Sequence, residues 1–361
     1  MTLRLHKTGI EFPDGSWQYS AQSSPVFKNL LINSDMRIDQ RNGGSAITVN
    51  ANAPFYPVDR FQAIGVATAG VFTAQQVSES PDGTSKSLKF TVTNTASSGA
   101  YRFQHHIEGN NVAHFGFGQP WAKTFTLSFW VKSSVTGTYS GSFRNSDHNR
   151  TYVYEYTIDT ADTWEKKTIT LTADTTGTWL TDNGAGLKLT WNLGKSSVGS
   201  ADSWQSGNYF ASANQTEWIA TSGATFYISQ PQLEVGETAT DFEHLPYDVS
   251  LSRCFRYYKQ LLAKGTRTAQ IGIGRTRTTG LVDGTVPLIS FPSVDMRTAP
   301  TLTMVGDYQV MQTSTYVDAV ISSTSTAGAI QLTGTFRVAD LPVAIHTKNT
   351  KESEIYLSAE L

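Results

Sequence analysis

Short runs in which apolar and polar residues alternate dominate this sequence. In the clearest run, 125–132, every second residue from Phe125 to Val131 is apolar. Such alternation places one face of an extended strand in a core and the other toward solvent. Turn residues separate these runs, which together predict a two-sheet jelly-roll β-sandwich over residues 27–247. Further runs lie at 87–92, 152–158, 166–172, 187–191 and 225–228.

One segment has helical rather than strand periodicity. From Leu251 onward, apolar residues recur every three or four positions, with Asp248 before them and Gly265 after them. Because Asp favours helix starts and Gly favours helix ends, a short junction helix is predicted at 248–265. Cys254 lies on the apolar stripe of this helix, which predicts a buried and inert thiol.

The remainder of the chain, residues 266–361, returns to short alternating runs. It is long enough for a second, smaller β-sandwich. The predicted fold class is therefore all-β: a jelly-roll β-sandwich, one short helix and a smaller C-terminal β-sandwich. Strands in this C-terminal part are expected at 285–291, 301–305, 329–338 and 354–361.

The N-terminal residues 1–26 form a separate small unit. Pro13-Asp14-Gly15 is a turn signal between two short alternating runs, which predicts a hairpin. Such a hairpin is either a strand pair added to the next domain or a segment that attaches the protein to a larger particle. For the second case, the candidate attachment residues are Ile10, Phe12 and Trp17.

Charge is sparse and balanced along the chain. Charged residues make up 16% of the sequence and give a formal net charge of -2. Acidic and basic residues are scattered along the sequence and form no basic stripe, so nucleic acid is not an expected partner. The single cysteine excludes an internal disulfide framework. Because the N-terminus lacks a signal-peptide core and no apolar run could span a bilayer, we expect synthesis in the cytoplasm without membrane insertion.

No motif for catalysis or metal binding stands out. His105 and His106 would point to opposite faces of a strand, which makes joint chelation of one metal awkward. Neither a P-loop nor a GxSxG elbow is present. A glycosidase needs only two suitably spaced carboxylates, but acids such as Glu108 and Asp182 lie near turns or strand ends, where they are ordinary. We therefore expect no catalytic residue, no metal and no cofactor.

Aromatic residues are the feature that points to a ligand. The chain has eight tryptophans, fifteen tyrosines and eighteen phenylalanines. An exposed ring can stack on the C–H face of a sugar while neighbouring polar groups bind its hydroxyls. The alternative for each tryptophan is that it fills the core or caps the end of the sandwich. The candidate glycan-binding residues are Trp179, Asp182, Asn183, Trp204, Tyr209 and Trp218.

Four motifs follow one another in the order found in phage and prophage tail-fibre proteins. Residues 29–41, NLLINSDMRIDQR, resemble the opening NLLINGDFRIWQRG of that family, and 56–61, YPVDRF, are similar to its YTADRW. Residues 232–258, from QLEVG to CFRYY, resemble its QLE.G..AT.FE.RPY segment and the CQRYY that follows. Residues 286–301 resemble the V.FP.PMR..PT entry to its terminal domain.

This resemblance implies a carbohydrate-binding-module-like jelly roll in a homotrimeric fibre. The expected function is that of a non-enzymatic adhesin in a virion tail or capsid fibre, which binds host surface polysaccharide and contacts other virion proteins through its N-terminus. Two alternatives are a purely structural fibre protein and a polysaccharide-degrading tailspike hydrolase. Related carbohydrate-binding modules often hold calcium with acids at places that here contain Arg37 and Ser229, so calcium is not expected.

Overall fold

The architecture comes from a computed structural model. It describes residues 4–6, 9–11, 17–18, 27–66, 69–266, 270–275, 282–290, 296–298, 300–305, 308–312, 315–318, 322–326, 329–336, 342–347 and 353–361.

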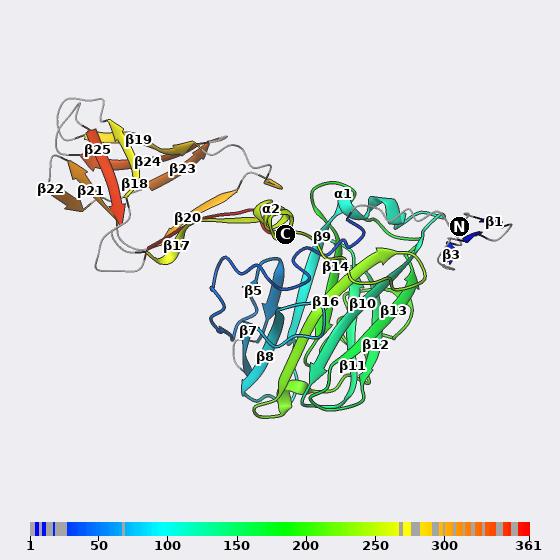
Figure 1. Cartoon of the computed structure of the whole chain (residues 1–361). Helices are drawn as coiled ribbons and strands as arrows, with labels where there is room; N and C mark the ends of the chain where they lie inside the picture. Colours follow the sequence, from blue (N-terminus) through cyan, green and yellow to red (C-terminus); the bar gives the residue numbers. More distant parts are fainter. Residues whose placement is uncertain are drawn as a thin grey trace.

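Two antiparallel sheets packed face to face form the main body of the chain (Figure 1). The two-sheet sandwich that the sequence predicts is thereby confirmed. The six-stranded sheet has the order β13 (Glu165–Thr172), β10 (Thr124–Ser133), β16 (Thr225–Val235), β8 (Ser87–Asn94), β7 (Val71–Val77) and β4 (Ile47–Val49). The seven-stranded sheet has the order β15 (Trp204–Ser206), β12 (Arg150–Ile158), β11 (Gly137–Arg144), β14 (Ala185–Asn192), β9 (Arg102–Glu108), β6 (Phe61–Ile64) and β5 (Phe55–Val58).

The core between the sheets is built from aromatic rings of both layers. Phe103 of β9 stacks on Trp191 of β14 with ring centroids 5.1 Å apart, and on Phe90 of β8 in the opposite sheet at 4.7 Å. The alternating apolar residues of β10 are buried in the same core, as the sequence predicts. Short helical segments occupy the loops: α1 (Gly109–Val112), η1 (Ala113–Phe115) and η2 (Trp218–Ala220).

The junction helix is shorter than the sequence predicts. Helix α2 spans Tyr247–Phe255, and strand β17 (Tyr258–Thr266) follows where the helix was expected to continue. Apolar residues such as Leu261 fit either periodicity, and pairing of β17 with β26 (Ser353–Ser358) decides in favour of the strand. Asp248 lies in the first helical turn rather than at the cap. Cys254 is buried, as predicted, and burial raises the pKa of its thiol.

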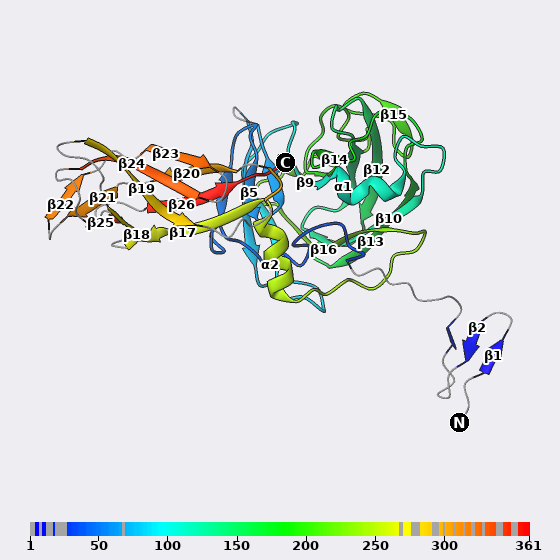
Figure 2. The same ribbon diagram turned by 90° about the horizontal axis from the view of Figure 1, so that it is seen from above.

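The C-terminal strands form three small antiparallel sheets, so the predicted β content of this part is confirmed. Their packing into a sandwich stays a prediction. Figure 2 shows these strands from above, beside the sandwich. Besides β17 and β26 they are β18 (Gln270–Arg275), β19 (Val282–Ser290), β20 (Thr301–Val305), β21 (Tyr308–Gln312), β22 (Thr315–Asp318), β23 (Ser322–Thr326), β24 (Ala329–Phe336) and β25 (Pro342–Thr347).

The N-terminal hairpin is present as predicted. Strands β2 (Gly9–Glu11) and β3 (Trp17–Gln18) pair antiparallel, and β1 (Arg4–His6) adds a third strand. Of the candidate attachment residues, Ile10 lies in β2 and Trp17 in β3, whereas Phe12 lies outside the described residues. Their role in attachment stays a prediction. Among the described helices, none combines the length and apolar character that a membrane span requires.

After β26 the last residues of the chain dock on the sandwich. The Glu360 carboxylate accepts a hydrogen bond from Arg41 at 2.8 Å and pairs with the buried guanidinium of Arg60. The main-chain oxygen of Leu361 accepts a hydrogen bond of 3.1 Å from Gln62. Figures 1 and 2 both place the C-terminus beside β9, next to the seven-stranded sheet.

Candidate functional site

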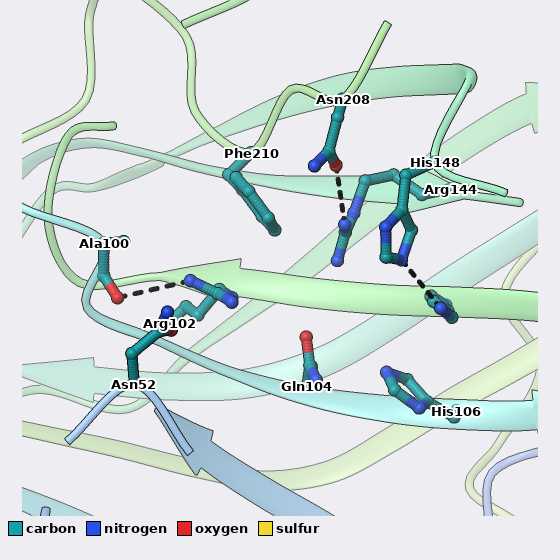
Figure 3. Close-up of a pocket in the computed structure, with 10 residues that line it drawn as sticks. Asn52, Ala100, Arg102, Gln104, His106, Arg144, His148, Asn208 and Phe210 are labelled. Carbon is teal, nitrogen blue, oxygen red and sulfur yellow. Dashed lines mark hydrogen bonds between the residues drawn. The ribbon is translucent and has the colours of Figure 1, made fainter. Parts of the chain in front are cut away.

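A cavity of about 370 Å³ opens on the outer face of the seven-stranded sheet, away from the core. Volumes of this order are usual for small-molecule sites. Its floor comes from β9, β11 and β14, and a loop at 207–210 forms one side (Figure 3). The lining residues are Asn52, Ala100, Arg102, Gln104, His106, Arg144, His148, Lys188, Asn208 and Phe210.

Strand alternation places these side chains. Along β9, Phe103 and Ile107 point into the core, so Arg102, Gln104 and His106 must point outward. The register continues this outer row across the sheet, because Lys188 of β14 lies opposite both His106 and, on its other side, Arg144 of β11. Long polar side chains from three neighbouring strands therefore meet in one place.

The predicted opposition of the two neighbouring histidines is confirmed by this register. His105 faces the core, where its ring lies 5.0 Å from that of Phe61 in an edge-to-face contact. His106 lies on the outer face and lines the cavity.

Two guanidinium groups flank one aromatic ring inside the cavity. The Arg102 Cζ atom lies 4.2 Å from the centre of the Phe210 ring, and the Arg144 Cζ atom lies 4.1 Å from it. Figure 3 shows the ring projecting between the two arginines. Such cation–π contacts hold both guanidinium planes in defined positions without neutralising their charge.

The cations of the cavity have only neutral hydrogen-bond partners. Arg144 donates to Asn208 Oδ1 at 2.9 Å and to Thr190 Oγ1 at 3.3 Å. Arg102 donates to the Ala100 carbonyl oxygen at 3.3 Å. Lys188 Nζ lies 2.7 Å from His148 Nε2. Across the part of the chain that the structure describes, no carboxylate forms an ion pair with Arg102, Arg144 or Lys188.

Burial and mutual repulsion act on the ionisation of this cluster. Burial, with the adjacent charge of Arg144, lowers the pKa of Lys188 to about 8, against a smaller opposing effect of Asp147. Burial lowers the pKa of His148 to about 4, with Lys188 adding to the effect. Burial likewise lowers the pKa of His106 well below its ordinary value, so both histidines are neutral at pH 7.

Several buried polar atoms at the cavity lack a partner within the described residues. Gln104 Oε1 and His106 Nε2 are unpartnered acceptors, since His106 Nδ1 already donates to the main-chain oxygen of Leu361 at 3.1 Å. The Nε atoms of Arg102 and Arg144 are unpartnered donors. Unsatisfied buried polar groups are costly, so their gathering in one cavity is what a polar binding site requires.

The tryptophan candidates lie away from this cavity. Trp179 is buried against Phe117, with ring centroids 4.4 Å apart, and meets Trp204 edge-to-face at 5.5 Å. Trp204 is half-buried in edge strand β15. Trp218 has no exposed surface and packs against Phe72 in the core, where it cannot stack on a sugar. Trp218 therefore fills the core, which is the alternative to a ligand role, while a ligand role for Trp204 stays a prediction.

The polar candidates lie in two separate places in the fold. Tyr209 lines a second hollow of about 450 Å³, on the other side of the 207–210 loop and beside Glu155. Asp182 and Asn183 are exposed on the loop before β14, and Asn183 Nδ2 donates to the Arg297 carbonyl oxygen at 3.0 Å. The structure thus brings none of these three into the cavity of Figure 3.

The two positions at which related modules often bind calcium serve structural contacts here. Arg37 pairs with Asp35 and donates to the Leu245 carbonyl oxygen at 2.8 Å, and Ser229 donates to a backbone carbonyl. Within the described ranges, no three His, Cys, Asp or Glu side chains lie together in a way that could hold a metal ion.

Arg102, Gln104, Arg144 and Lys188 were not foreseen from the sequence. One signal was available, because polar Arg102, Gln104 and His106 alternate with apolar Phe103 and Ile107. Because the solvated face of an antiparallel sheet is ordinarily polar, this alternation indicates which side chains face outward, but it does not distinguish a site from an ordinary surface.

Comparisons with known proteins concern the sandwich fold. No protein-family model matches the sequence, and no curated protein matches it. The chain is similar in structure to the enzymatically active domain of tailspike protein 4 from bacteriophage CBA120, with a TM-score of 0.33 and 14% identity over 58% of this chain and 22% of that one. A family 4 carbohydrate-binding module gives a TM-score of 0.29 and 14% identity over 57% of this chain and 99% of that one. A family 11 carbohydrate-binding module from Clostridium thermocellum, in complex with a mixed-linked tetrasaccharide, gives a TM-score of 0.28 and 13% identity over 56% of this chain and 100% of that one. The chain is thus similar to carbohydrate-binding-module-like β-sandwich domains and to a phage tailspike domain.

Proposed function

We propose that this chain is a carbohydrate-binding protein whose sugar site is the cavity on the outer face of the seven-stranded sheet. One observation carries the proposal: buried, unpartnered hydrogen-bonding atoms converge there, including Gln104 Oε1 and His106 Nε2. Sugar hydroxyls both donate and accept, so they are suited to satisfy acceptors and donors held on neighbouring strands.

Rigid strands support this assignment. The side chains that form the floor come from β9, β11 and β14, in the interior of a seven-stranded sheet. Gln104 is fixed by a hydrogen bond of 2.7 Å from its Nε2 to Gln62 Oε1. A site on such a scaffold keeps its geometry before the ligand arrives, which lowers the entropic cost of binding.

The biological setting that we propose is a bacteriophage fibre. The motivation is the ordered set of sequence motifs at 29–41, 56–61, 232–258 and 286–301. In this setting the jelly roll binds host surface polysaccharide as a non-enzymatic adhesin, the chain assembles as a homotrimer in the virion, and residues 1–26 contact other virion proteins.

Binding of labelled protein to a panel of bacterial surface glycans tests the sugar site. We expect saturable binding, weakened about five- to tenfold by Gln104→Leu, which removes one of the cavity's two unpartnered acceptors. Gln75→Leu is the matched control because Gln75 lies in β7, on the opposite sheet. Equal weakening by both variants would refute the site, and absence of any saturable binding would favour a purely structural fibre.

Two further measurements test the proposed setting as a trimeric, non-enzymatic phage fibre. Native mass spectrometry should give three times the chain mass of 39.5 kDa. Incubation with the bound polysaccharide should release no new reducing ends, and their appearance would instead indicate a tailspike-type hydrolase.

A further inference from the structure

We infer that the sugar bound in this cavity is acidic, and that its carboxylate lies against Arg102, Arg144 and Lys188. This inference rests on the proposed function, since it names the ligand class of the same site.

The first argument is the convergence of positive charge. Lys188 lies directly opposite Arg144 in the register of β14 and β11. Arg102 and Arg144 contact the same phenylalanine ring, at 4.2 and 4.1 Å. Three cationic side chains from three strands are thus held around one cavity, where their charges repel one another.

The second argument is that, among the described residues, no carboxylate pairs with these three cations, and Asp147 acts on Lys188 only as a nearby charge. Elsewhere in the sandwich the fold supplies one: Arg150, for example, pairs with Asp174 at 2.6 Å. Arg144 has only 2% of its surface exposed, yet within the described ranges its partners are the neutral side chains of Asn208 and Thr190. A buried cation without an anionic partner is unfavourable, so the cavity is predisposed to accept an anion from outside the chain.

The third argument is the geometry of the available donors. The Nε atoms of Arg102 and Arg144 have no partner among the described residues. A guanidinium group offers parallel N–H donors that match the two oxygens of a carboxylate. Lys188 adds a point charge from the adjacent strand, which favours the same anion without fixing its orientation.

The fourth argument is the neutral half of the site. Gln104 Oε1 and His106 Nε2 are acceptors that a carboxylate cannot use but a sugar hydroxyl can. The cavity therefore combines a cationic part with a hydroxyl-binding part. A free inorganic anion would satisfy only the first, whereas a uronic-acid-type residue satisfies both.

The test uses the full chain and a panel of acidic surface polysaccharides, each in native and carboxyl-reduced form. Reduction turns each carboxylate into a primary alcohol and leaves the sugar backbone unchanged. We expect native forms to bind about tenfold or more tightly than their reduced forms, and added salt to weaken only the native ones.

Two variants locate the effect. Arg144→Met and Lys188→Met should each remove most of the preference for the native form, and Lys188→Met decides the matter if Arg144→Met does not fold. Lys166→Met is the matched control, because Lys166 is exposed on β13 of the other sheet.

The outcomes separate the two proposals. If reduced and native glycans bind equally and Gln104→Leu weakens both, the sugar site stands and the acidic ligand is refuted. If preference for the native form survives in Lys188→Met, the anion lies elsewhere. If no glycan of either form binds, the proposed function itself is refuted.

Discussion

Lys188 gives the cavity a positive charge that a change of pH can remove. The groups that face it are Arg144 on β11, His106 on β9, and Asp147 and His148 on the loop between β11 and β12. Both histidines are neutral from pH 7 upward because burial lowers the pKa of each. Burial also lowers the pKa of Arg144 to about 9 and that of Arg102 to about 10, so both arginines stay mostly charged up to pH 8. Lys188 is therefore the first of these groups to lose its proton as the pH rises above 7, and this loss is the main change in the cluster up to pH 9.

The size of the effect follows from the Lys188 pKa of about 8. Roughly 90% of Lys188 is protonated at pH 7 and roughly 10% at pH 9, while a uronate carboxylate stays ionised throughout. If the charged form binds the anion, the association constant should fall roughly tenfold between these two pH values. Lowering the pH from 7 to 6 should change it little.

Isothermal titration with a native acidic oligosaccharide at pH 6, 7, 8 and 9 measures this dependence. Lys188→Met should bind more weakly at pH 7 and show a flat profile from pH 6 to 8, and Lys166→Met should retain the wild-type fall. A wild-type profile that is flat from pH 7 to 9, or a fall between pH 7 and 8 that persists in Lys188→Met, would refute the reasoning.

Three further predictions concern stability. Trp218→Ala should lower the free energy of unfolding by about 3–5 kcal/mol in urea denaturation, because it empties a fully buried site; a loss below about 1 kcal/mol would contradict the burial. The free energy of unfolding should decrease as the pH falls below 6.5, because buried His105 stays neutral in the folded protein but binds a proton in the unfolded one. The contribution of His105 to this decrease approaches about 1.4 kcal/mol per pH unit. His105→Gln should flatten the dependence of stability on pH between pH 7 and 5. Glu108→Gln should cost about 1–3 kcal/mol in thermal or urea unfolding, because the buried carboxylate accepts hydrogen bonds from Arg256 at 2.7 and 2.8 Å. Glu108→Gln and Arg256→Gln together should cost less than the sum of the two single losses, and fully additive losses would contradict the pairing.

Local patterns in the sequence were sufficient for the strands and for the sandwich. Alternation along 125–132 identified β10, because a strand with one buried face has a period of two whatever its neighbours are. Alternation also gave the opposite facing of His105 and His106. The junction helix ended early because the spacing near Leu261 suits both periods, and pairing with β26, about a hundred residues later, decides between them.

The site depends on relations that no local pattern contains. Arg102, Arg144 and Lys188 are separated by about forty residues each and meet only because β9, β14 and β11 are neighbours in the sheet. Strand order in a sandwich follows from long-range connections, which periodicity does not reveal. For the same reason the sequence could not tell a buried tryptophan such as Trp218 from a half-buried one such as Trp204.

The docking of the last residues against His106 has a consequence for how the cavity senses its ligand. The main-chain oxygen of Leu361 can only accept a hydrogen bond, so the bond of 3.1 Å from His106 Nδ1 selects the tautomer whose Nε2 presents a lone pair to the cavity. A residue 255 positions along the chain thereby fixes the polarity of one contact in the site. Docking of the tail and binding of a hydroxyl that donates to Nε2 are therefore coupled. The free energy by which the docked tail strengthens hydroxyl binding equals the free energy by which hydroxyl binding stabilises the docked tail. The strand β26 that carries the tail is thus energetically linked to the proposed sugar site.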